Sequence, residues 1–295
     1  MSVLVAGSAN LDFVVRADHI PSPGETVLGR EFRTFPGGKG ANQAIACARA
    51  GGASTQMLLA LGNDEFAASI ENSLREAGVA MHTVRCASEA TGTAFICVSD
   101  NADNAITVAP GANAALRAEH LPPLAGVSHL LLQLETPLDT VTAYARSAHA
   151  AGVRVVLNAA PARALPSELL DNVDLLIVNE GELAAISGVR DDVPAALDRI
   201  AIPNVIVTLG ACGSLARTTD GVLQQAGFSV DAVDTTAAGD TFCGALVAAL
   251  HRGEPLADGL RFASAAAAIA CTRLGAQSSI PTFDDVRAFL ASHNP

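Results

Sequence analysis

The sequence predicts an α/β fold with a central, mostly parallel β-sheet, helices on both of its faces, and a small β-sheet that forms a lid. Strand-like apolar runs alternate with helical runs along the chain, which is typical of parallel sheets built from β-α-β units. Two segments interrupt this alternation with a period of two. Half of the 295 residues are hydrophobic, which is enough for a large core. We expect residues 1–295 to form a single domain.

The apolar pattern predicts the elements of this sheet in order. Val3–Ala6 is the first buried strand, and Gly40–Ala50 is a helix because its apolar residues recur at helical spacing. Glu65–Ala77 is a second helix with one apolar face. The other expected strands are Gln56–Leu61, Val153–Leu157, Leu175–Val178 and Val205–Leu209, and the other expected helices are Leu138–Ala150, Thr241–His251, Leu256–Arg273 and Phe283–Ser292. Right-handed crossovers place helices on both faces of such a sheet.

The two interrupting segments are the predicted lid. Residues 13–35 are rich in proline and glycine, and residues 93–109 alternate apolar and polar side chains around an Asn-rich turn. Both patterns favour hairpin strands over helices. Together they would lie over an active site as a small sheet. Its unpaired edges and half-covered faces predict a homodimer that forms through the lid.

Composition excludes several classes of function. The formal net charge is −12, and an acidic chain lacks the basic face that nucleic acids require. No apolar run approaches the roughly 18–20 residues that cross a bilayer, and we expect no signal peptide because the first residues lack a basic region. The six cysteines form no CxxC pair and the seven histidines form no zinc motif. These features predict a cytoplasmic protein with reduced thiols.

The strongest local motif is the segment Asp234–Ala245, in which small residues lead into Asp240 and then into an apolar helix. Small side chains let successive backbone N–H groups face a ligand, and a helix N-terminus adds partial positive charge. This combination predicts an anion hole for a phosphoryl group during transfer. Asp240 would orient or deprotonate an attacking hydroxyl. The alternative is that Asp240 only caps the helix.

A second glycine-rich segment, Gly37–Ala44, fails both standard phosphate-binding patterns. A Walker A loop needs a glycine five residues before its Gly-Lys pair and a serine or threonine after it, where this chain has Arg33 and Gly40. The dinucleotide-binding pattern lacks its third glycine, because Gln43 stands there. Taken alone, the segment also fits a tight turn with a solvated Lys39.

Together, the two motifs resemble the two signature segments of the PfkB (ribokinase-like) family of carbohydrate kinases. Further segments are similar to the family's first sugar-binding segment, first lid turn, NxxE motif and nucleotide loop: Gly7–Asp12, Pro23–Thr26, Asn179–Glu182 and Thr208–Gly213. Others are similar to its ribokinase branch: Gly111–Leu116, Gln133–Pro137, Pro161–Arg163 and Thr272–Gln277. The resemblance implies a Rossmann-like α/β domain with a β lid. It also implies ATP-dependent phosphorylation of D-ribose at the 5-hydroxyl, giving ribose 5-phosphate.

The resemblance implies roles for the matching residues. Asp240 would contact the sugar and act as the catalytic base, with the N–H groups of Ala237, Ala238 and Gly239 as the anion hole. Carboxylates, amides and an ammonium suit hydroxyls that donate and accept, and those expected around the sugar are Asn10, Asp12, Gly38, Lys39, Asn42 and Glu135. Taken alone, Asp12 would be a turn aspartate and Glu135 a surface acid.

On the nucleotide side, the resemblance implies that Asn179 and Glu182 act near Mg²⁺ and the phosphates, Glu182 through water. Their alternative role is a helix capping box. The expected ATP pocket also contains Thr208, Gly210, Gly213, Gly239 and Ser264. Ser264 stands where a ribokinase can carry a histidine near the adenine, so the contact with the base could differ.

A potassium site next to the anion hole is also implied. The matching positions, most of them acting through backbone carbonyls, are Asp234, Thr236, Ala270, Arg273, Gly275 and Ser279. A buried carboxylate at Asp234 would be costly without a partner, and a cation would supply one. Arg273 is expected to brace the loop rather than bind the ion. The alternative is that Asp234 only caps its turn and no ion site exists.

Two rival interpretations stay open. The first keeps the chemistry and changes the substrate to 2-deoxyribose, another sugar, a sugar phosphate or a nucleoside. Glu135 and Asn42 favour a free pentose, whereas the lid could read an extra phosphate with Arg16, Arg30 and Arg33. The second is a non-catalytic sugar-binding regulator on the same fold, against which the intact Asp240 motif argues.

Overall fold

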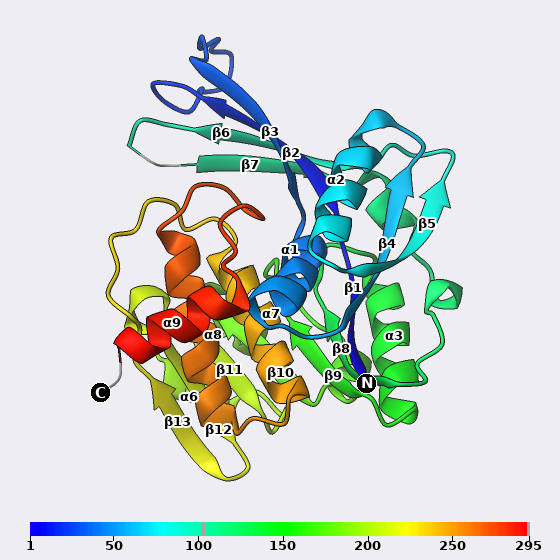
Figure 1. The fold of residues 1–295 in the computed structure, drawn as a ribbon, viewed down its shortest axis with the longest axis vertical. Helices are drawn as coiled ribbons and strands as arrows, with labels where there is room; N and C mark the ends of the chain where they lie inside the picture. The colour runs from blue at the N-terminus through cyan, green and yellow to red at the C-terminus, as the bar shows by residue number, and fades with distance from the viewer. Residues whose placement is uncertain (102–103, 294–295) are drawn as a thin grey trace.

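Two β-sheets and the helices around them form the computed structural model, which describes residues 1–101 and 104–293 (Figure 1). Residues 102–103, in the predicted Asn-rich turn of the lid, lie outside the described residues, as do 294–295. Within the described part, the central sheet has nine strands in the order β13-β12-β11-β10-β9-β8-β1-β4-β5. A smaller sheet has four strands in the order β3-β2-β6-β7.

The central sheet is parallel from β5 to β11, and an antiparallel hairpin extends it. Its strands are β1 (Ser2–Ala6), β4 (Thr55–Gly62), β5 (Ala80–Cys86), β8 (Val127–Leu132), β9 (Arg154–Asn158), β10 (Leu175–Asn179), β11 (Val205–Thr208), β12 (Ser214–Thr218) and β13 (Gly221–Gln225). Every strand predicted for this sheet is present to within one residue at each end. The strands β5, β8, β12 and β13 were not predicted.

Alternate residues of the parallel strands pack into two helical layers. Val3 and Val5 of β1 belong to one core, whereas Leu4 and Ala6 belong to the other, because successive side chains point to opposite faces. The first core is covered by α1 (Lys39–Ile45), α2 (Glu65–Glu76), α7 (Ala238–His251), α8 (Leu256–Cys271) and α9 (Phe283–Ser292). The second is covered by α3 (Leu138–Ala150), α4 (Ser167–Leu170), α5 (Glu180–Ser187) and α6 (Val193–Asp198). No helix of the described residues is long and apolar enough to span a membrane.

The helices α1 and α7 approach closely because α7 has a glycine where they meet. A Cβ atom on Gly244 would lie 2.5 Å from the backbone oxygen of Gln43 and 2.5 Å from the Cβ atom of Ala46. The Cys47 thiol donates a hydrogen bond to the Gly244 carbonyl at 3.2 Å, in the π-helical turn Ala46–Ala50 that continues α1. This close approach brings polar side chains of α1 next to the first turn of α7.

The smaller sheet occupies the segments predicted for the lid and projects from the body at the top of Figure 1. Its strands are β2 (Asn10–Arg16), β3 (Glu31–Gly37), β6 (Gly92–Val98) and β7 (Asn104–Ala109). One face of this sheet turns Asp12, Val14 and Arg16 toward a cavity above the body. The opposite face carries a stack of Phe13 with Phe32 and Phe95.

Candidate active site

The carboxyl ends of the parallel strands meet at one edge of the central sheet. The chain continues from β1 to β4 on one side and reaches β8 on the other, so the strand order reverses at β1. Ligands of open α/β sheets bind outside the strand ends at such a point. Polar residues stand at or just beyond these ends, namely Ser8, Gln133, Asn158, Asn179 and Thr208.

Asp240 lies inside the first turn of α7 rather than at its cap. The helix begins three residues earlier than predicted, and its N-cap is Ala237, whose φ angle is 59° and whose side chain makes no capping bond. The Asp240 carboxylate is buried, and each of its oxygens accepts an amide hydrogen bond of 2.9 Å, from Asn42 Nδ2 and from Gln43 Nε2. The alternative that Asp240 only caps the helix is therefore wrong.

The first turn of α7 also presents backbone N–H groups. Thr241 donates the first helical bond, to the Ala237 carbonyl at 2.8 Å, so the N–H groups of Gly239 and Asp240 have no partner inside the helix. A Cβ atom on Gly239 would meet no atom within 4 Å, so this end of the helix is open to a ligand. The Ala238 N–H, by contrast, donates to the Thr235 carbonyl at 3.2 Å.

The residues predicted around the sugar gather on the lid side of Asp240. Glu135 Oε2 accepts a hydrogen bond from Ser8 Oγ at 2.6 Å and another from the Lys39 N–H at 3.1 Å. Asn10, on the first residue of β2, is buried and accepts from Asn113 Nδ2 at 2.8 Å. These contacts join the loop after β1, the start of α1 and the loop after β8.

Gly38 allows the start of α1 to pack against the loop that links the two sheets. Its φ angle is 89°, and a Cβ atom there would lie 2.8 Å from the Ala9 Cα atom. A side chain would therefore separate α1 from this loop. Lys39 and Asn42 follow on the first turn of α1, and their position next to Asp240 depends on this contact.

Three carboxylates and one ammonium share this part of the molecule. Burial, and then the charges of Glu135 and Asp240, raise the pKa of Asp12 to about 7. The pKa of Lys39 is raised chiefly by the negative charge of Asp240. No ion pair between the Lys39 ammonium and Asp240 is present among the described residues. The two opposite charges are therefore neighbours without direct contact.

A pocket of about 140 Å³ lies beside Asp240. It is lined by Lys39, Asn158, Asn179, Glu182, Thr208, Ala237, Gly239 and Cys243, among others. Asn179 and Glu182 also form the capping box of α5, because Glu182 N–H donates to Asn179 Oδ1 at 2.7 Å and Asn179 N–H to Glu182 Oε2 at 2.8 Å. The capping role and the pocket position therefore coexist. Burial raises the pKa of Glu182.

The other residues predicted for the nucleotide differ in their surroundings. Gly210 follows β11 with a φ angle of 56° and faces open space. Gly213 has a φ angle of 98°, and a Cβ atom there would lie 2.0 Å from the Gln225 carbonyl oxygen, so the β12–β13 hairpin itself requires this glycine. Ser264 is buried in α8 and does not line the pocket beside Asp240.

The two loops predicted to hold potassium lie against each other through Asp234. Its carboxylate is half-buried and accepts hydrogen bonds of 2.9 Å from the N–H groups of Thr236 and Gly275. Burial opposes ionisation, but these hydrogen bonds prevail and lower the pKa of Asp234. The carboxylate therefore has two backbone partners without a cation, as the alternative of a turn cap requires.

The remaining residues of that set face their own loop. Ser279 is buried and donates to the Ala276 carbonyl at 2.7 Å, and the Ala270 carbonyl accepts from the Arg273 N–H at 3.1 Å. The Arg273 guanidinium lies 3.2 Å from the Asp285 carboxylate. Across residues 1–101 and 104–293, no group of three or more His, Cys, Asp or Glu side chains is placed to hold a metal ion.

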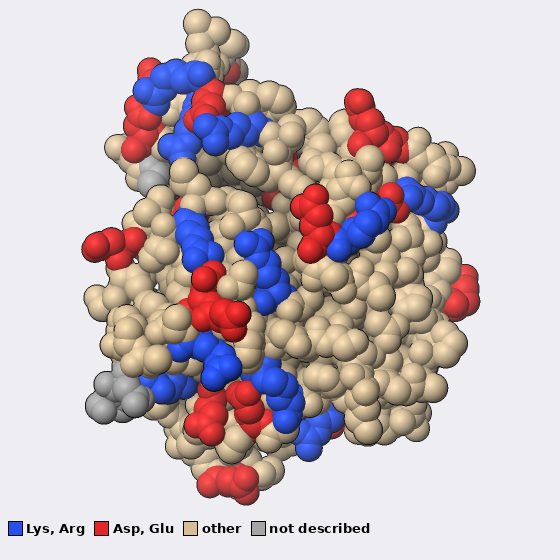
Figure 2. Space-filling model, in the orientation of Figure 1, with Lys and Arg blue, Asp and Glu red and all other residues tan. Residues whose placement is uncertain are grey.

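A cavity of about 700 Å³ separates the lid from the loops that precede α7 and follow α8. The arginines that could read an extra phosphate there are already paired with acids. Arg16 and Arg33 both pair with Glu31, and Arg30 pairs with Asp18 and Asp100. Figure 2 shows this mixture of basic and acidic side chains on the lid at the top of the molecule. The pairing weakens the argument for a sugar phosphate.

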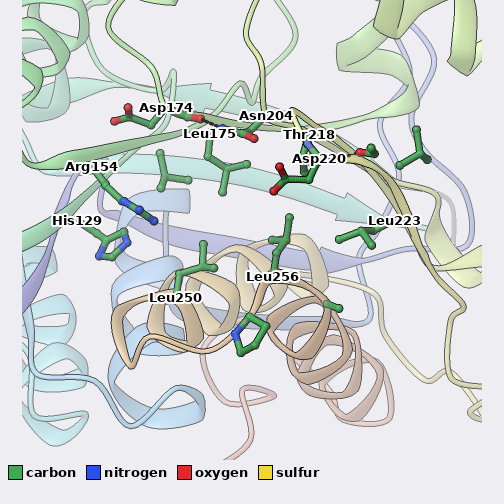
Figure 3. A pocket seen from close by; sticks show the side chains of 15 residues that line it. His129, Arg154, Asp174, Leu175, Asn204, Thr218, Asp220, Leu223, Leu250 and Leu256 are labelled. Carbon is green, nitrogen blue, oxygen red and sulfur yellow. Dashed lines mark hydrogen bonds between the residues drawn. The ribbon is translucent and has the colours of Figure 1, made fainter.

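A second hollow, of about 620 Å³, lies at the opposite edge of the central sheet (Figure 3). Leu175, Leu250 and Leu256 line its middle, and Arg154 and His129 lie together at one end. His129 is buried, and burial lowers its pKa to about 4. This hollow contains none of the residues that the sequence singled out.

Sequence reasoning missed several polar residues that support the site. Gln43 contacts Asp240 directly, and Gln133 and Asn158 contact Gln43. Ser8 and Asn113 hold Glu135 and Asn10. A signal was available for Gln43, because it follows Asn42 in a glycine-rich segment and is polar in the middle of an apolar helix. Gln133 and Asn158 gave a weaker signal, as polar residues at the ends of apolar strands.

Comparison with known proteins accords with this geometry. The sequence signature of the pfkB family carbohydrate kinases matches residues 1–283. The chain belongs to this family. Because the match covers nearly the whole chain, it includes both the segments of the central sheet and those of the lid.

Relatives of the same length narrow the comparison within the pfkB family. The chain is 39% identical to the ribokinase of Haemophilus influenzae over 98% of both proteins. It is 32% identical to the deoxyribokinase of Salmonella typhi over 99% of both. The structure of Arabidopsis thaliana ribokinase, complexed with ribose and ATP, superimposes with a TM-score of 0.90 at 32% identity over 98% of both chains.

Proposed function

We propose that this kinase transfers the γ-phosphoryl group of ATP to the 5-hydroxyl of D-ribose and releases ribose 5-phosphate. The similarity to ribokinases over the full length supports this substrate. The observation that carries the proposal is the position of Asp240. Its buried carboxylate contacts Asn42, one of the residues predicted around the sugar, and lines the pocket beside α5 at the open N-terminus of α7.

Asp240 orients the 5-hydroxyl and accepts its proton as the hydroxyl oxygen attacks the phosphorus. Asn42 and Gln43 hold the two carboxylate oxygens at 2.9 Å. Phosphoryl transfer has a loose transition state, so the position of this carboxylate matters more than its basicity. The N–H groups of Ala237 and Gly239 face the phosphoryl oxygens and neutralise the charge that develops. The Ala238 N–H holds the turn through Thr235.

The polar cluster below the lid recognises the sugar. Asp12 and Glu135 accept hydrogen bonds from sugar hydroxyls, and Asn10 and Asn42 can donate or accept. Asn42 Oδ1 is buried and has no partner among the described residues, which leaves it available to a hydroxyl donor. Lys39 offers its ammonium between the sugar and the phosphates, next to the backbone of Gly38.

The pocket beside α5 would hold Mg²⁺ and the phosphate end of the nucleotide. Asn179, Glu182 and Thr208 supply oxygen atoms at its wall, which suit a hard cation that keeps several waters. Bound Mg²⁺ neutralises phosphate charge during transfer. Gly210 and Gly213 place the turn after β11 near the nucleotide, whereas Ser264 would contact the base only from beyond this pocket.

Potassium activation is proposed from the contact between the loops of Asp234 and Gly275. The carboxylate has two N–H partners, yet its oxygens retain further lone pairs, and neighbouring carbonyls can complete a shell. A cation there would stiffen the turn that aims the donors of α7. Initial rates compared in potassium, sodium and tetramethylammonium chloride, for the parent and for Asp234→Ala, test this. Equal parent rates in all three salts would remove the ion site.

The proposal extends to the movement of the lid, the oligomeric state of the enzyme and its location in the cell. The chain acts as a single kinase domain whose lid strands close over the sugar. Phe32 and Phe95 are 60% and 54% exposed on the outer face of the lid, and a homodimer through this face would cover them. Light scattering at micromolar concentration tests the dimer. We place the enzyme in the cytoplasm.

A steady-state assay of ADP release tests the substrate directly. D-ribose, 2-deoxyribose, ribose 5-phosphate and a nucleoside are compared at equal concentrations, with Asp240→Asn as the inactive control. The proposal expects the highest kcat/KM with ribose. A higher kcat/KM with another acceptor would identify that acceptor as the substrate in place of ribose. Sugar binding without ADP release would favour the rival interpretation, a non-catalytic sugar-binding regulator.

A further inference from the structure

Gln43 is a buried amide at the centre of the site that touches neither pocket. Its side chain is 0% exposed and does not line the pocket beside Asp240 or the cavity below the lid. Its Nε2 group donates to Asp240 Oδ1 and to Asn158 Oδ1, each at 2.9 Å. A polar side chain in the apolar interface of two helices is costly unless it is hydrogen-bonded, and both N–H groups of the Gln43 amide donate hydrogen bonds.

The direction of the Gln43 amide is fixed by its neighbours. Gln133 Nε2 donates to Gln43 Oε1 at 2.7 Å, so the oxygen of Gln43 faces Gln133 and its NH₂ group faces Asp240. Asn158 is held in turn by its own bond to the Ile177 carbonyl at 3.2 Å. The chain of donors therefore runs from Gln133 through Gln43 to Asp240, and only a donor can stand next to Asp240 Oδ1.

Lys39 is the competitor for this carboxylate. The charge of Asp240 is the largest cause of the raised pKa of Lys39, yet the two groups form no ion pair among the described residues. In a buried site, the attraction between opposite charges strengthens because the dielectric constant falls. The hydrogen bonds from the side-chain amides of Asn42 and Gln43 hold both carboxylate oxygens. They oppose the rotation that would bring the Asp240 carboxylate into contact with Lys39.

We propose that Gln43 is a positioning residue that, together with Asn42, holds Asp240 out of contact with Lys39 and directed at the sugar hydroxyl. The inference rests on the proposed role of Asp240 as the base. A direct ion pair would occupy both the base and the ammonium. Gln43 thereby keeps both groups available to the substrates, although it touches neither substrate itself.

The first test replaces the amide by a side chain of similar size without donors. Gln43→Met should lower kcat by about 10- to 100-fold, because a misplaced reacting group costs rate at this scale. The KM for the sugar should stay within about threefold, because the lost contact acts on the transition state. Thr140→Val is the matched control. It removes another buried hydrogen bond, from Thr140 Oγ1 to the Leu116 carbonyl at 3.0 Å, away from the site.

Thermal unfolding of both variants separates positioning from structure. The proposal expects a similar loss of Tm in Gln43→Met and Thr140→Val, with a loss of kcat in Gln43→Met alone. It is overturned if Gln43→Met keeps the kcat of the parent. It is also overturned if the KM for the sugar rises as much as kcat falls.

The second test uses the isosteric Gln43→Glu, whose carboxyl group can donate to Asp240 only when it is protonated. Two adjacent buried carboxylates cannot both ionise easily, so the introduced group titrates at a raised pH. The kcat of Gln43→Glu relative to the parent should therefore rise as the pH falls from 8 to 6, on the order of tenfold. The same ratio for Gln43→Met should stay flat. A flat ratio for Gln43→Glu overturns the proposal.

Failure of the proposed function would look different. If the parent shows no kinase activity with any acceptor, or if Asp240→Asn keeps the turnover of the parent, the role of Asp240 fails before Gln43 is tested. If Asp240→Asn is inactive and Gln43→Met is fully active, the role of Asp240 as the base is supported and the positioning role of Gln43 is refuted. If the parent prefers another sugar, both tests are run with that sugar.

Discussion

The two edges of the central sheet carry hollows of opposite character. At the carboxyl edge, a pocket of about 140 Å³ is lined by Lys39, Glu182 and Asp240. At the amino edge, a hollow of about 620 Å³ has a mainly aliphatic middle and holds a buried histidine whose pKa is lowered. The smaller pocket is the candidate active site. The comparison teaches that the density of hydrogen-bonded charge, rather than the size of a hollow, indicates chemistry.

The helix α7 connects the two edges and helps to explain the difference. Its N-terminus, with Asp240, lies at the carboxyl edge, and Leu250 near its C-terminus lines the hollow at the amino edge. The partial positive charge of a helix dipole stands at the N-terminus. Parallel sheets repeat this arrangement at each crossover, so an anionic substrate is favoured at the carboxyl edge.

The sharpest test of the comparison is Asp240→Asn. We expect turnover to fall by at least about 10²-fold, because a positioned proton acceptor is lost, while the affinity for the sugar stays largely intact. Calorimetry measures the affinity, and a coupled ADP assay measures turnover. Turnover within a few-fold of the parent would show that Asp240 is not the catalytic base. The assignment of the active site to the carboxyl edge would then lose its main support.

Protonation of His129, at the amino edge, should change the free energy of unfolding rather than the catalytic activity. The pKa of His129 is lowered from 6.5 to about 4 by burial and then by Arg154 and His251. The unfolded chain therefore binds the proton more tightly, and stability is lost as the pH falls from about 6.5 toward 4. We expect His129 to contribute about 2 kcal/mol to the loss of unfolding free energy between pH 7 and pH 5.

Urea unfolding at pH 7 and pH 5 measures this loss. His129→Gln should reduce the loss by that amount, and the exposed His149→Gln serves as the matched control. An identical pH dependence in the parent and in His129→Gln would show that protonation of this side chain does not oppose folding.

A smaller effect of pH is expected on sugar binding at the carboxyl edge. The pKa of Asp12 is raised to about 7 by burial, Glu135 and Asp240, so the free enzyme holds this group partly protonated near neutrality. The ionised carboxylate accepts hydrogen bonds from sugar hydroxyls at both oxygens, whereas the protonated form carries a donor on one of them. The affinity should therefore be about tenfold weaker at pH 6 than at pH 8, as measured by calorimetry. Asp12→Asn should bind weakly with no such dependence; a persisting dependence would assign it to another group.

The smallest expected effect concerns two charged residues of the hollow at the amino edge. Arg154 and Asp220 line it, and Arg154 lies on the exposed first residue of β9. Replacing both by alanine should change turnover by less than about twofold, since exposed substitutions away from a site have small effects. A tenfold loss in the ADP assay would instead mean that the two edges act together.

The sequence predicted five of the seven parallel strands, β1, β4, β9, β10 and β11, because they are continuous apolar runs. The missed strands differ in a physical way. The edge strand β5 mixes polar and apolar residues and is mostly half-buried, and β13 is largely exposed, so neither shows an apolar run. The strand β8 begins with Val127, Ser128 and His129, and its polar residues concealed the apolar residues that follow.

The site was predictable where a residue carries its own chemistry and less so where a contact defines it. Asp240 was singled out from its own motif, and Lys39 and Glu135 were singled out through the resemblance to the pfkB family. Gln43 was not singled out, although it is a polar residue within an apolar helix, because its role depends on its contacts across the interface between α1 and α7. The partners of Asp234 could not be seen in the sequence for the same reason, since one of them is the backbone N–H of Gly275, 41 residues later.

The absence of a side chain at Gly244 limits which substitutions the enzyme can tolerate in α7. Even a methyl group would meet the backbone of Gln43 and the side chain of Ala46, and α1 would have to shift away from α7. Such a shift would carry Asn42 and Gln43 away from Asp240 at the same time. A saturation library at position 244 should therefore select glycine alone, although this position is one turn beyond Asp240 and is not among the residues that line the three cavities described above. Tolerance to substitution in this helix would then record the spacing between two backbones rather than contact with any ligand.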